Sequence, residues 1–180
     1  MIEIKEFQGF KFIQKDGLTQ SCVPALPNGY WRQMIPDGIE PENALVLGLG
    51  AGTVCAELKA MFPKIQIEAV ENNAQMLKLA RKEFGVNELV EKVYNANAFD
   101  FVKSHPTRYS LVIVDLYDGF NFSLRTISDE FLHYCKMLLK EGGWLTVNLP
   151  NLEMCERQFN AVKKSETNKI YFFQLDTLIH

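Results

Sequence analysis

The stretch ALVLGLGAGTVCAELKAMFPKIQIEAVENN, residues 44–73, constrains the fold more than any other part of the chain. It begins with an apolar run, passes through glycines at positions 48, 50 and 52, and continues with a helical pattern. A second strand-like run follows and ends on Glu71. A strand, a tight glycine turn, a helix and a second strand form the repeating unit of a parallel sheet. We therefore expect the glycines in the turn after the first strand of such a sheet.

Strand-like runs alternate with helical patterns from Ala44 onwards. The runs LVLGL and LVIVDL are apolar at nearly every position, which is typical of central parallel strands buried on both faces. The sequence thus predicts an α/β fold with a mostly parallel, doubly wound sheet. A helical pattern over residues 152–164 precedes the last run, KIYFFQLDTLI. Sheets of this class close with two strands, of which the second is antiparallel. No residues follow this last run to form that second strand, so we expect either that the sequence is a shortened one or that the sheet ends early on a bare edge.

Residues 1–35 have a different texture from the rest of the chain. Apolar and polar positions alternate around Gly9 and the pair Asp16-Gly17, as in FKFIQKDGLTQSCV, which is a strong signal for a hairpin. We divide the chain into a β appendage of residues 1–35 and an α/β domain of residues 36–180.

The composition is that of an ordinary globular protein, 47% hydrophobic and 23% charged. A net charge of -3 gives no basic footprint for nucleic acid or an anionic membrane, so we expect a small-molecule partner. Four widely spaced cysteines form no CxxC pair, which predicts reduced thiols and no metal site. No 18 apolar residues run together, and we expect a cytoplasmic protein. The bare sheet edge leaves a homo-oligomer open.

The spacing between the glycines and Glu71 predicts a nucleoside site. Glycines let backbone N–H groups approach a ligand, and an acid 19 residues after Gly52 can accept both hydroxyls of a ribose. The alternative is a structural glycine turn followed by a solvated acid. Dinucleotide sites favour GxGxxG, but Thr53 occupies the third glycine position here.

The pattern GLGAG with this acid resembles the first motif of class I S-adenosylmethionine-dependent enzymes, which have a Rossmann-like fold. In that class an Asp-Ala pair after the third strand commonly contacts the adenine amino group. Asn97-Ala98 stands there in this chain, and an Asn oxygen can accept the same hydrogen bond without a charge. The resemblance implies that the cofactor is bound by Gly48, Gly50, Gly52, Glu71, Asn97, Ala98 and Asp115.

More closely, the chain resembles the spermidine synthase family across most of its length. The matching stretches are KDGLTQS, LVLGLGAGTV, the acid of VENN, NANAFDFV, YSLVIVDLYD and SDEFLHYCKMLLKEGGWLTVN. The resemblance implies that Asp115 is the base toward an attacking amine and that Asp118 helps to hold the amine. It also assigns Gln20 and Tyr117 to the substrate site. The alternative for the two aspartates is that they are solvated turn residues.

Two departures bear on the substrate. The family's glycine turn carries an aspartate for the aminopropyl group where this chain has Ala51, and a family glutamate for the polyamine is replaced by Gln33. Unpaired amines in a closed pocket are costly, so these losses argue against a polyamine. We therefore favour methyl transfer from S-adenosylmethionine to a small molecule. The alternatives are aminopropyl transfer from decarboxylated S-adenosylmethionine and a non-catalytic nucleoside-binding or scaffold protein.

Overall fold

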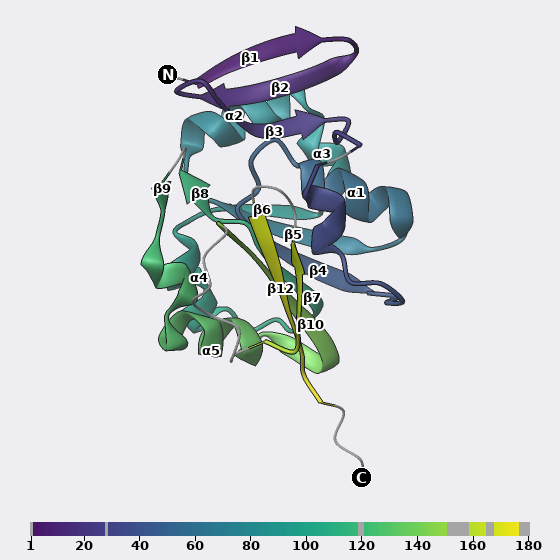
Figure 1. Ribbon diagram of the computed structural model, residues 1–180, viewed down its shortest axis with the longest axis vertical. Coiled ribbons are helices and arrows are strands. Elements are labelled where there is room, and N and C mark those ends of the chain that lie inside the picture. Colours follow the sequence, from purple (N-terminus) through teal and green to yellow (C-terminus); the bar gives the residue numbers. More distant parts are fainter. Residues whose placement is uncertain (1, 28, 119–120, 151–158, 165–167, 177–180) are drawn as a thin grey trace.

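The computed structural model describes residues 2–27, 29–118, 121–150, 159–164 and 168–176, and only the backbone of residues 118, 121, 122 and 164. A seven-stranded sheet runs through the middle of the molecule (Figure 1). Its strands are β4 Asn43–Leu47, β5 Gln66–Glu71, β6 Lys92–Asn95, β7 Tyr109–Val114, β10 Leu139–Pro150, β11 Ala161–Lys164 and β12 Asn168–Gln174. Their order across the sheet is β11-β12-β10-β7-β4-β5-β6.

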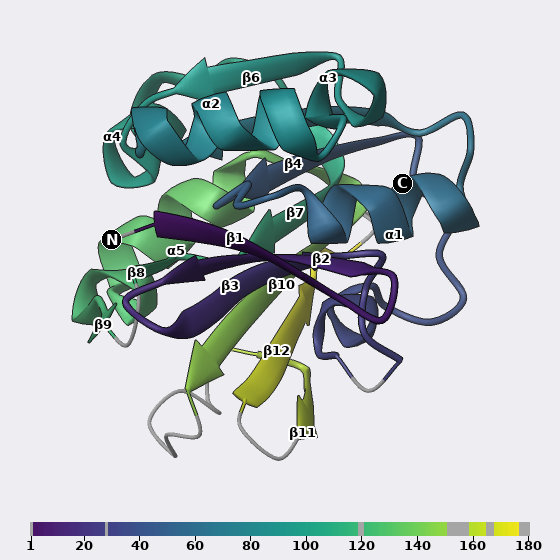
Figure 2. The same cartoon turned by 90° about the horizontal axis from the view of Figure 1, so that it is seen from above.

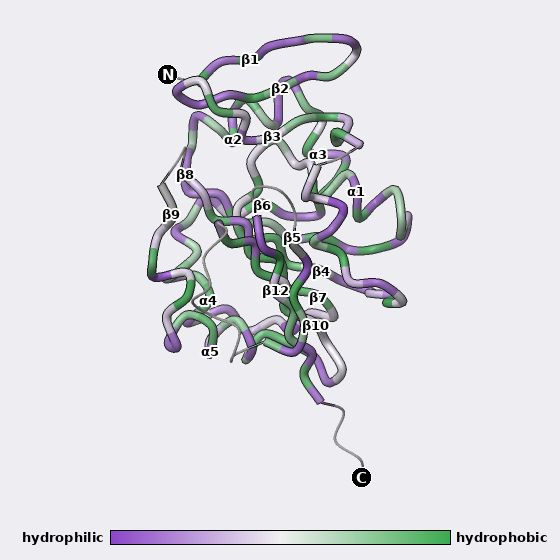
Figure 3. The backbone as a smooth tube through the Cα atoms, viewed as in Figure 1, coloured by the Kyte–Doolittle hydropathy of each residue, from purple (hydrophilic) through white to green (hydrophobic). Residues whose placement is uncertain are grey.

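Five neighbouring strands of this sheet are mutually parallel, as the sequence predicts: β10, β7, β4, β5 and β6. Strand β4, the middle one of these five, is buried on both faces. Its residues Ala44 and Val46 belong to the hydrophobic cluster on one face of the sheet, and Leu45 and Leu47 belong to the cluster on the opposite face. In Figure 3 hydrophobic colour gathers in the middle of the molecule, where these strands pack. The predicted α/β fold with a mostly parallel sheet is therefore confirmed.

Helices cover both faces of the sheet. They are α1 Thr53–Met61, α2 Ala74–Glu83, α3 Val86–Leu89, α4 Ala98–Ser104 and α5 Asp129–Met137. The helices α1, α2 and α3 pack on one face, and α4 and α5 pack on the other. Figure 2, seen from above, shows α1 and α5 on opposite sides of the sheet. The side chain of Asn73 caps α2 by accepting the backbone N–H groups of Gln75 and Met76. Among the described residues, no helix has the length and apolar character that a membrane crossing requires.

The far edge of the sheet differs from the sequence prediction. Strand β12 pairs antiparallel with β10, and β11 pairs antiparallel with β12, so KIYFFQ is itself the antiparallel closing strand. The expected helical pattern is wrong over Ala161–Lys164, where the backbone instead pairs with β12. Strand pairing is favoured over a helix there, because β12 would otherwise have unpaired backbone N–H and C=O groups on that side. Ile170 and Tyr171 of β12 are fully buried, and buried backbone groups require hydrogen-bond partners. Residues 151–158 lie outside the described residues.

The N-terminal residues form a three-stranded antiparallel sheet of β1 Ile2–Phe7, β2 Phe10–Lys15 and β3 Leu18–Val23. Asp16 and Gly17 both have positive φ values, 52° and 82°, as the predicted hairpin turn requires. The short helices η1 Trp31–Met34 and η2 Leu124–Ile127 and the small hairpin of β8 Tyr117–Asp118 with β9 Asn121–Phe122 complete the fold. Figure 1 shows the three-stranded sheet lying across one end of the large sheet.

Candidate functional site

A cavity of about 440 Å³ lies at the carboxyl ends of β4, β5 and β7, next to the three-stranded sheet. The chain leaves β4 toward β5 and β6 on one side and returns to β7 and β10 on the other. Ligands of open parallel sheets bind at such a reversal of strand order. The volume is within the range of small-molecule sites, about 300–1,000 Å³. Its walls come from β2, β3, the segment around η1, the glycine turn, the end of β5 and the segments that follow β6 and β7.

Two of the predicted glycines bring separate segments of the site together. Gly48 has a φ of +93°, and a Cβ there would lie 2.1 Å from the backbone oxygen of Asp115. A Cβ on Gly50 would lie 2.5 Å from Oγ of Ser21 on β3. Both contacts require glycine, and both glycines line the cavity. Gly52 is absent from the cavity lining among the described residues and packs instead against the side chain of Val86.

The three-stranded sheet is attached to the glycine turn by buried hydrogen bonds. The hydroxyl of Ser21 accepts the N–H of Ala51 at 2.9 Å. The Thr53 hydroxyl accepts the N–H of Cys22 at 3.1 Å and donates to the Cys22 carbonyl at 3.0 Å. Because Ala51 is fully buried and its N–H is already paired, this position offers the cavity no polar side chain and no free backbone donor.

Glu71 ends β5 at the wall of the cavity. One carboxylate oxygen accepts the N–H of Gly50 at 3.1 Å, and the other accepts the N–H of Asn73 at 2.8 Å. Burial raises the pKa of Glu71, while these backbone N–H groups favour the ionised carboxylate and oppose that rise. Each oxygen of a carboxylate can accept two hydrogen bonds, so Glu71 retains acceptor capacity toward the cavity.

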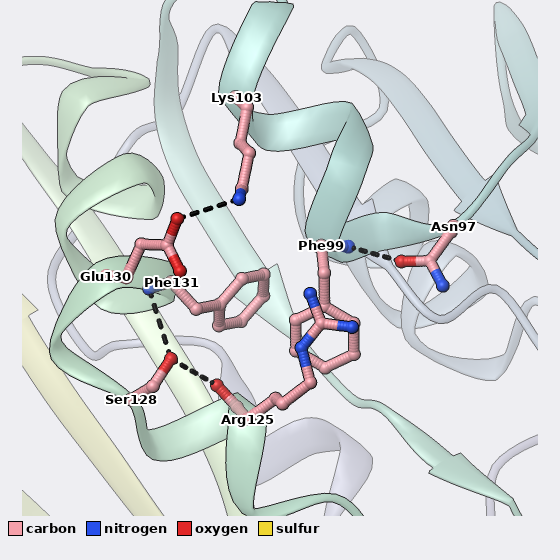
Figure 4. A network of polar contacts seen from close by, with 7 residues as sticks. All are labelled: Asn97, Phe99, Lys103, Arg125, Ser128, Glu130 and Phe131. Carbon is pink, nitrogen blue, oxygen red and sulfur yellow. Dashed lines mark hydrogen bonds and ion pairs between the residues drawn. The ribbon is translucent and has the colours of Figure 1, made fainter.

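Asn97 and Phe99 form the wall at the start of α4 (Figure 4). Oδ1 of Asn97 accepts the N–H of Phe99 at 2.9 Å and caps the helix. The Phe99 ring is held by the Phe131 ring, 4.6 Å away, and by the Arg125 guanidinium, 4.3 Å from its centroid. No described residue bonds the Asn97 amide nitrogen, which leaves it available as a donor. Ala98 also lines the cavity.

Asp115 follows β7 at the other end of the cavity. Its Oδ1 accepts Nδ2 of Asn148 at 2.8 Å, and the hydroxyl of Tyr30 lies 3.1 Å from Oδ2. Burial raises the pKa of Asp115 to about 6, although the hydrogen bonds from Asn148 and Tyr30 favour the ionised form. Burial, with the Asp115 carboxylate nearby, raises the pKa of Tyr30, so its hydroxyl stays protonated and can donate. Asp115 is therefore a carboxylate that titrates close to neutral pH.

Sequence reasoning missed the two residues that hold Asp115. Tyr30 belongs to the stretch YWRQMI, in which the comparison with the family pattern concerns only Gln33. In the structure Tyr30 and Trp31 line the cavity, and Arg32 is exposed. Asn148 is a polar residue near the end of the apolar run GWLTVNLP, and that position was a usable signal.

The comparisons with known proteins agree with this geometry. The model of the methyltransferase small domain matches residues 33–173. The chain belongs to the methyltransferase small domain family. Polyamine aminopropyltransferase 2 of Aquifex aeolicus is 35% identical over 111 residues, which are 57% of this chain and 22% of the relative. Ribosomal RNA small subunit methyltransferase C of Actinobacillus pleuropneumoniae serotype 7 is 25% identical over 189 residues, 93% of this chain and 56% of the relative.

A spermidine synthase solved in complex with the transition state analogue AdoDATO has the same fold. It is 17% identical, with a TM-score of 0.76, over 96% of this chain and 69% of that one. The resemblance to spermidine synthases is thus confirmed for the fold. The matching relatives are named as transferases, and the activity of this chain stays a proposal. The chain spans between 22% and 56% of the length of the two curated relatives.

Most of the predicted site residues meet in one cavity of this methyltransferase small domain. Gln20 and Tyr117 line the cavity together with the residues described above. The side chain of Asp118 lies outside the described part of the chain, so its role stays a prediction. Because one relative is a ribosomal RNA methyltransferase, the expected absence of a nucleic-acid partner also stays a prediction.

Proposed function

We propose that this chain is a transferase that binds S-adenosylmethionine in the cavity and moves its methyl group to a small-molecule acceptor beside Asp115. The position of Glu71 supports this most strongly. It stands at the end of the strand next to the glycine turn, and the N–H of Gly50 in that turn bonds to it directly. An acid so placed accepts ribose hydroxyls in nucleoside sites of this architecture.

The cavity fits the adenosine part of the cofactor. Glu71 would hold the ribose with the acceptor capacity that its two backbone hydrogen bonds leave. Phe99 and Met76 supply apolar surface for a planar base, and the Asn97 amide can donate to a ring nitrogen. When bound, S-adenosylmethionine supplies a methyl group activated by a sulfonium. Gly48 and Gly50 keep the turn close enough for backbone contact.

The basic residue in the cavity wall favours a carboxylated tail over a bare amine. Ala51 brings no carboxylate, and its N–H is already bonded to Ser21. Among the described residues that line the cavity, Lys15 on β2 is the one cation. Both donors carry an amine on the tail, but only S-adenosylmethionine also carries a carboxylate, which a lysine can attract. A lysine therefore favours the tail of S-adenosylmethionine over the purely cationic tail of the decarboxylated donor.

Asp115 is suited to an acceptor that carries an N–H or O–H group. At neutral pH most Asp115 side chains are ionised, because their pKa is about 6, so the carboxylate can orient the nucleophile and receive its proton. The same property fits an amine, which makes aminopropyl transfer the second candidate. The binding preference for the donor separates the two.

Calorimetry with S-adenosylmethionine, its decarboxylated form and NAD tests the proposal. We expect S-adenosylmethionine to bind most tightly, and Glu71→Ala to weaken it by about 1.5–3 kcal/mol, which is the range for hydrogen bonds to a charged group. Glu88→Ala, which removes an exposed acid outside the cavity lining, is the control and should bind normally. Tighter binding of the decarboxylated donor would favour aminopropyl transfer. Unchanged affinity of Glu71→Ala would refute the site.

A further inference from the structure

Three polar side chains from neighbouring strands meet at the Asp115 end of the cavity. Asp115 directly follows β7, Asn148 lies near the end of β10, and Asn168 begins β12. In the sheet register Asn148 is opposite Ile170, and Pro150 is opposite Asn168, so Asn148 and Asn168 share one face. The antiparallel direction of β12 is what puts its first residue beside the carboxyl ends of the parallel strands.

These side chains form a directed chain of hydrogen bonds. Asn168 donates Nδ2 to Oδ1 of Asn148 at 2.9 Å, and Asn148 donates Nδ2 to Oδ1 of Asp115 at 2.8 Å. Asn168 Nδ2 also lies 3.4 Å from the hydroxyl of Tyr117. If the Asn148 amide were turned over, its oxygen would face the carboxylate and its nitrogen would face another donor. The network is therefore consistent in one direction only.

Burial makes this arrangement restrictive. The side chain of Asn148 is fully buried, so it cannot exchange its partners for water. A buried amide whose two ends are both paired has one stable orientation. It fixes the Asp115 carboxylate through Oδ1, while Tyr30 approaches mainly Oδ2. Acceptor capacity of the carboxylate remains for a group in the cavity.

We propose that Asn148 and Asn168 are positioning residues for Asp115: Asn168 fixes the direction of the Asn148 amide, and Asn148 holds the carboxylate ionised and aimed at the acceptor. Their use in catalysis rests on the proposed function, since a carboxylate that orients a nucleophile must itself be held in place. The hydrogen-bond chain can be tested without any ligand.

The titratable groups that face Asp115 are tyrosines. Tyr30 contacts it directly, and burial raises the pKa of both Tyr30 and Tyr117, so both hydroxyls are neutral near pH 6. Lys15 and Glu71 are the basic and acidic side chains that the described cavity wall holds besides Asp115. All four are retained in the variants proposed here, so a change in the Asp115 titration reports on the amides.

The experiment follows the carboxyl carbon of Asp115 by ¹³C NMR as a function of pH in the ligand-free protein. Asn148→Leu removes the donor at similar volume and should raise the pKa of Asp115 from about 6 by roughly one to two pH units. Asn168→Ala leaves Asn148 in place but frees its amide to turn, so we expect a smaller rise in the same direction. If Asn148→Leu does not fold, Asn168→Ala decides the test by itself.

Thr146→Val is the matched control. Thr146 lies on the same strand and face, is fully buried, and its hydroxyl has no hydrogen-bond partner among the described residues. It should leave the pKa of Asp115 unchanged. An unchanged pKa in folded Asn148→Leu or Asn168→Ala, or an equal rise in Thr146→Val, would overturn the inference. Failure of S-adenosylmethionine to bind the parent protein would instead overturn the proposed function.

Discussion

Replacing Asp115 with Asn should stabilise the folded protein at alkaline pH and have no such effect in acid. Asp115 is enclosed by the cavity wall, and burial raises its pKa from the ordinary value of 3.8 to about 6. The folded state therefore binds the carboxyl proton more tightly than the unfolded state does. Above pH 6 the ionised carboxylate lowers the free energy of unfolding, and this cost disappears as the pH falls from 6 to below 3.8.

The size of the effect follows from the two pKa values. A difference of one pH unit corresponds to about 1.36 kcal/mol, so a pKa of about 6 against 3.8 corresponds to about 3 kcal/mol. Asn keeps an oxygen that can accept from Asn148 and an amide that can donate to Tyr30, so few hydrogen bonds are lost. We expect Asp115→Asn to raise the free energy of unfolding by up to about 3 kcal/mol at pH 8, by less near pH 6, and by nearly nothing at pH 3.5.

Urea denaturation of the parent and the variant at these three pH values measures the difference. Glu42→Gln is an informative control, because Lys140 lowers the pKa of this exposed carboxylate. The ionised form of Glu42 therefore favours the folded state, whereas the ionised form of Asp115 disfavours it. It should give no stabilisation at pH 8. A difference between parent and Asp115→Asn that is the same at pH 8 and pH 3.5 would show that Asp115 does not titrate as the structure requires.

Three further results are expected. Gly48→Ala places a Cβ 2.1 Å from the Asp115 backbone oxygen at a φ of +93°. It should lower the free energy of unfolding in urea by at least about 2 kcal/mol, and an unchanged stability would contradict the described turn. Ser21→Ala leaves the buried Ala51 N–H unpaired and should cost about 1–3 kcal/mol, whereas a neutral result would mean that β3 is not attached there. Lys15→Ala should weaken the binding of S-adenosylmethionine by about 1 kcal/mol in calorimetry, and should leave the binding of the decarboxylated donor unchanged or make it tighter. An equal loss of affinity for both donors would remove the argument for a carboxylated tail.

The parallel core and one half of the site follow from local sequence. An apolar run such as LVLGL, followed by a glycine turn and a helical pattern, is typical of a strand in the middle of a parallel sheet. An acid that ends the next parallel strand then emerges at the same edge as the glycine turn. Gly48, Gly50 and Glu71 were therefore predictable, because their relation depends on one strand–helix–strand unit that is contiguous in the chain.

The Asp115 end depends on residues that are far apart in the sequence, and only the tertiary structure brings them together. Tyr30 directly precedes η1 and contacts Asp115, which is 85 residues further along the chain. Asn168 reaches Asn148 because β12 runs antiparallel. The pattern over residues 152–164 looked helical, and the pairing of Ala161–Lys164 with β12 overrode it. Helical periodicity is a local property, whereas strand pairing and the pKa of a buried carboxyl are decided by which distant groups the fold places around them.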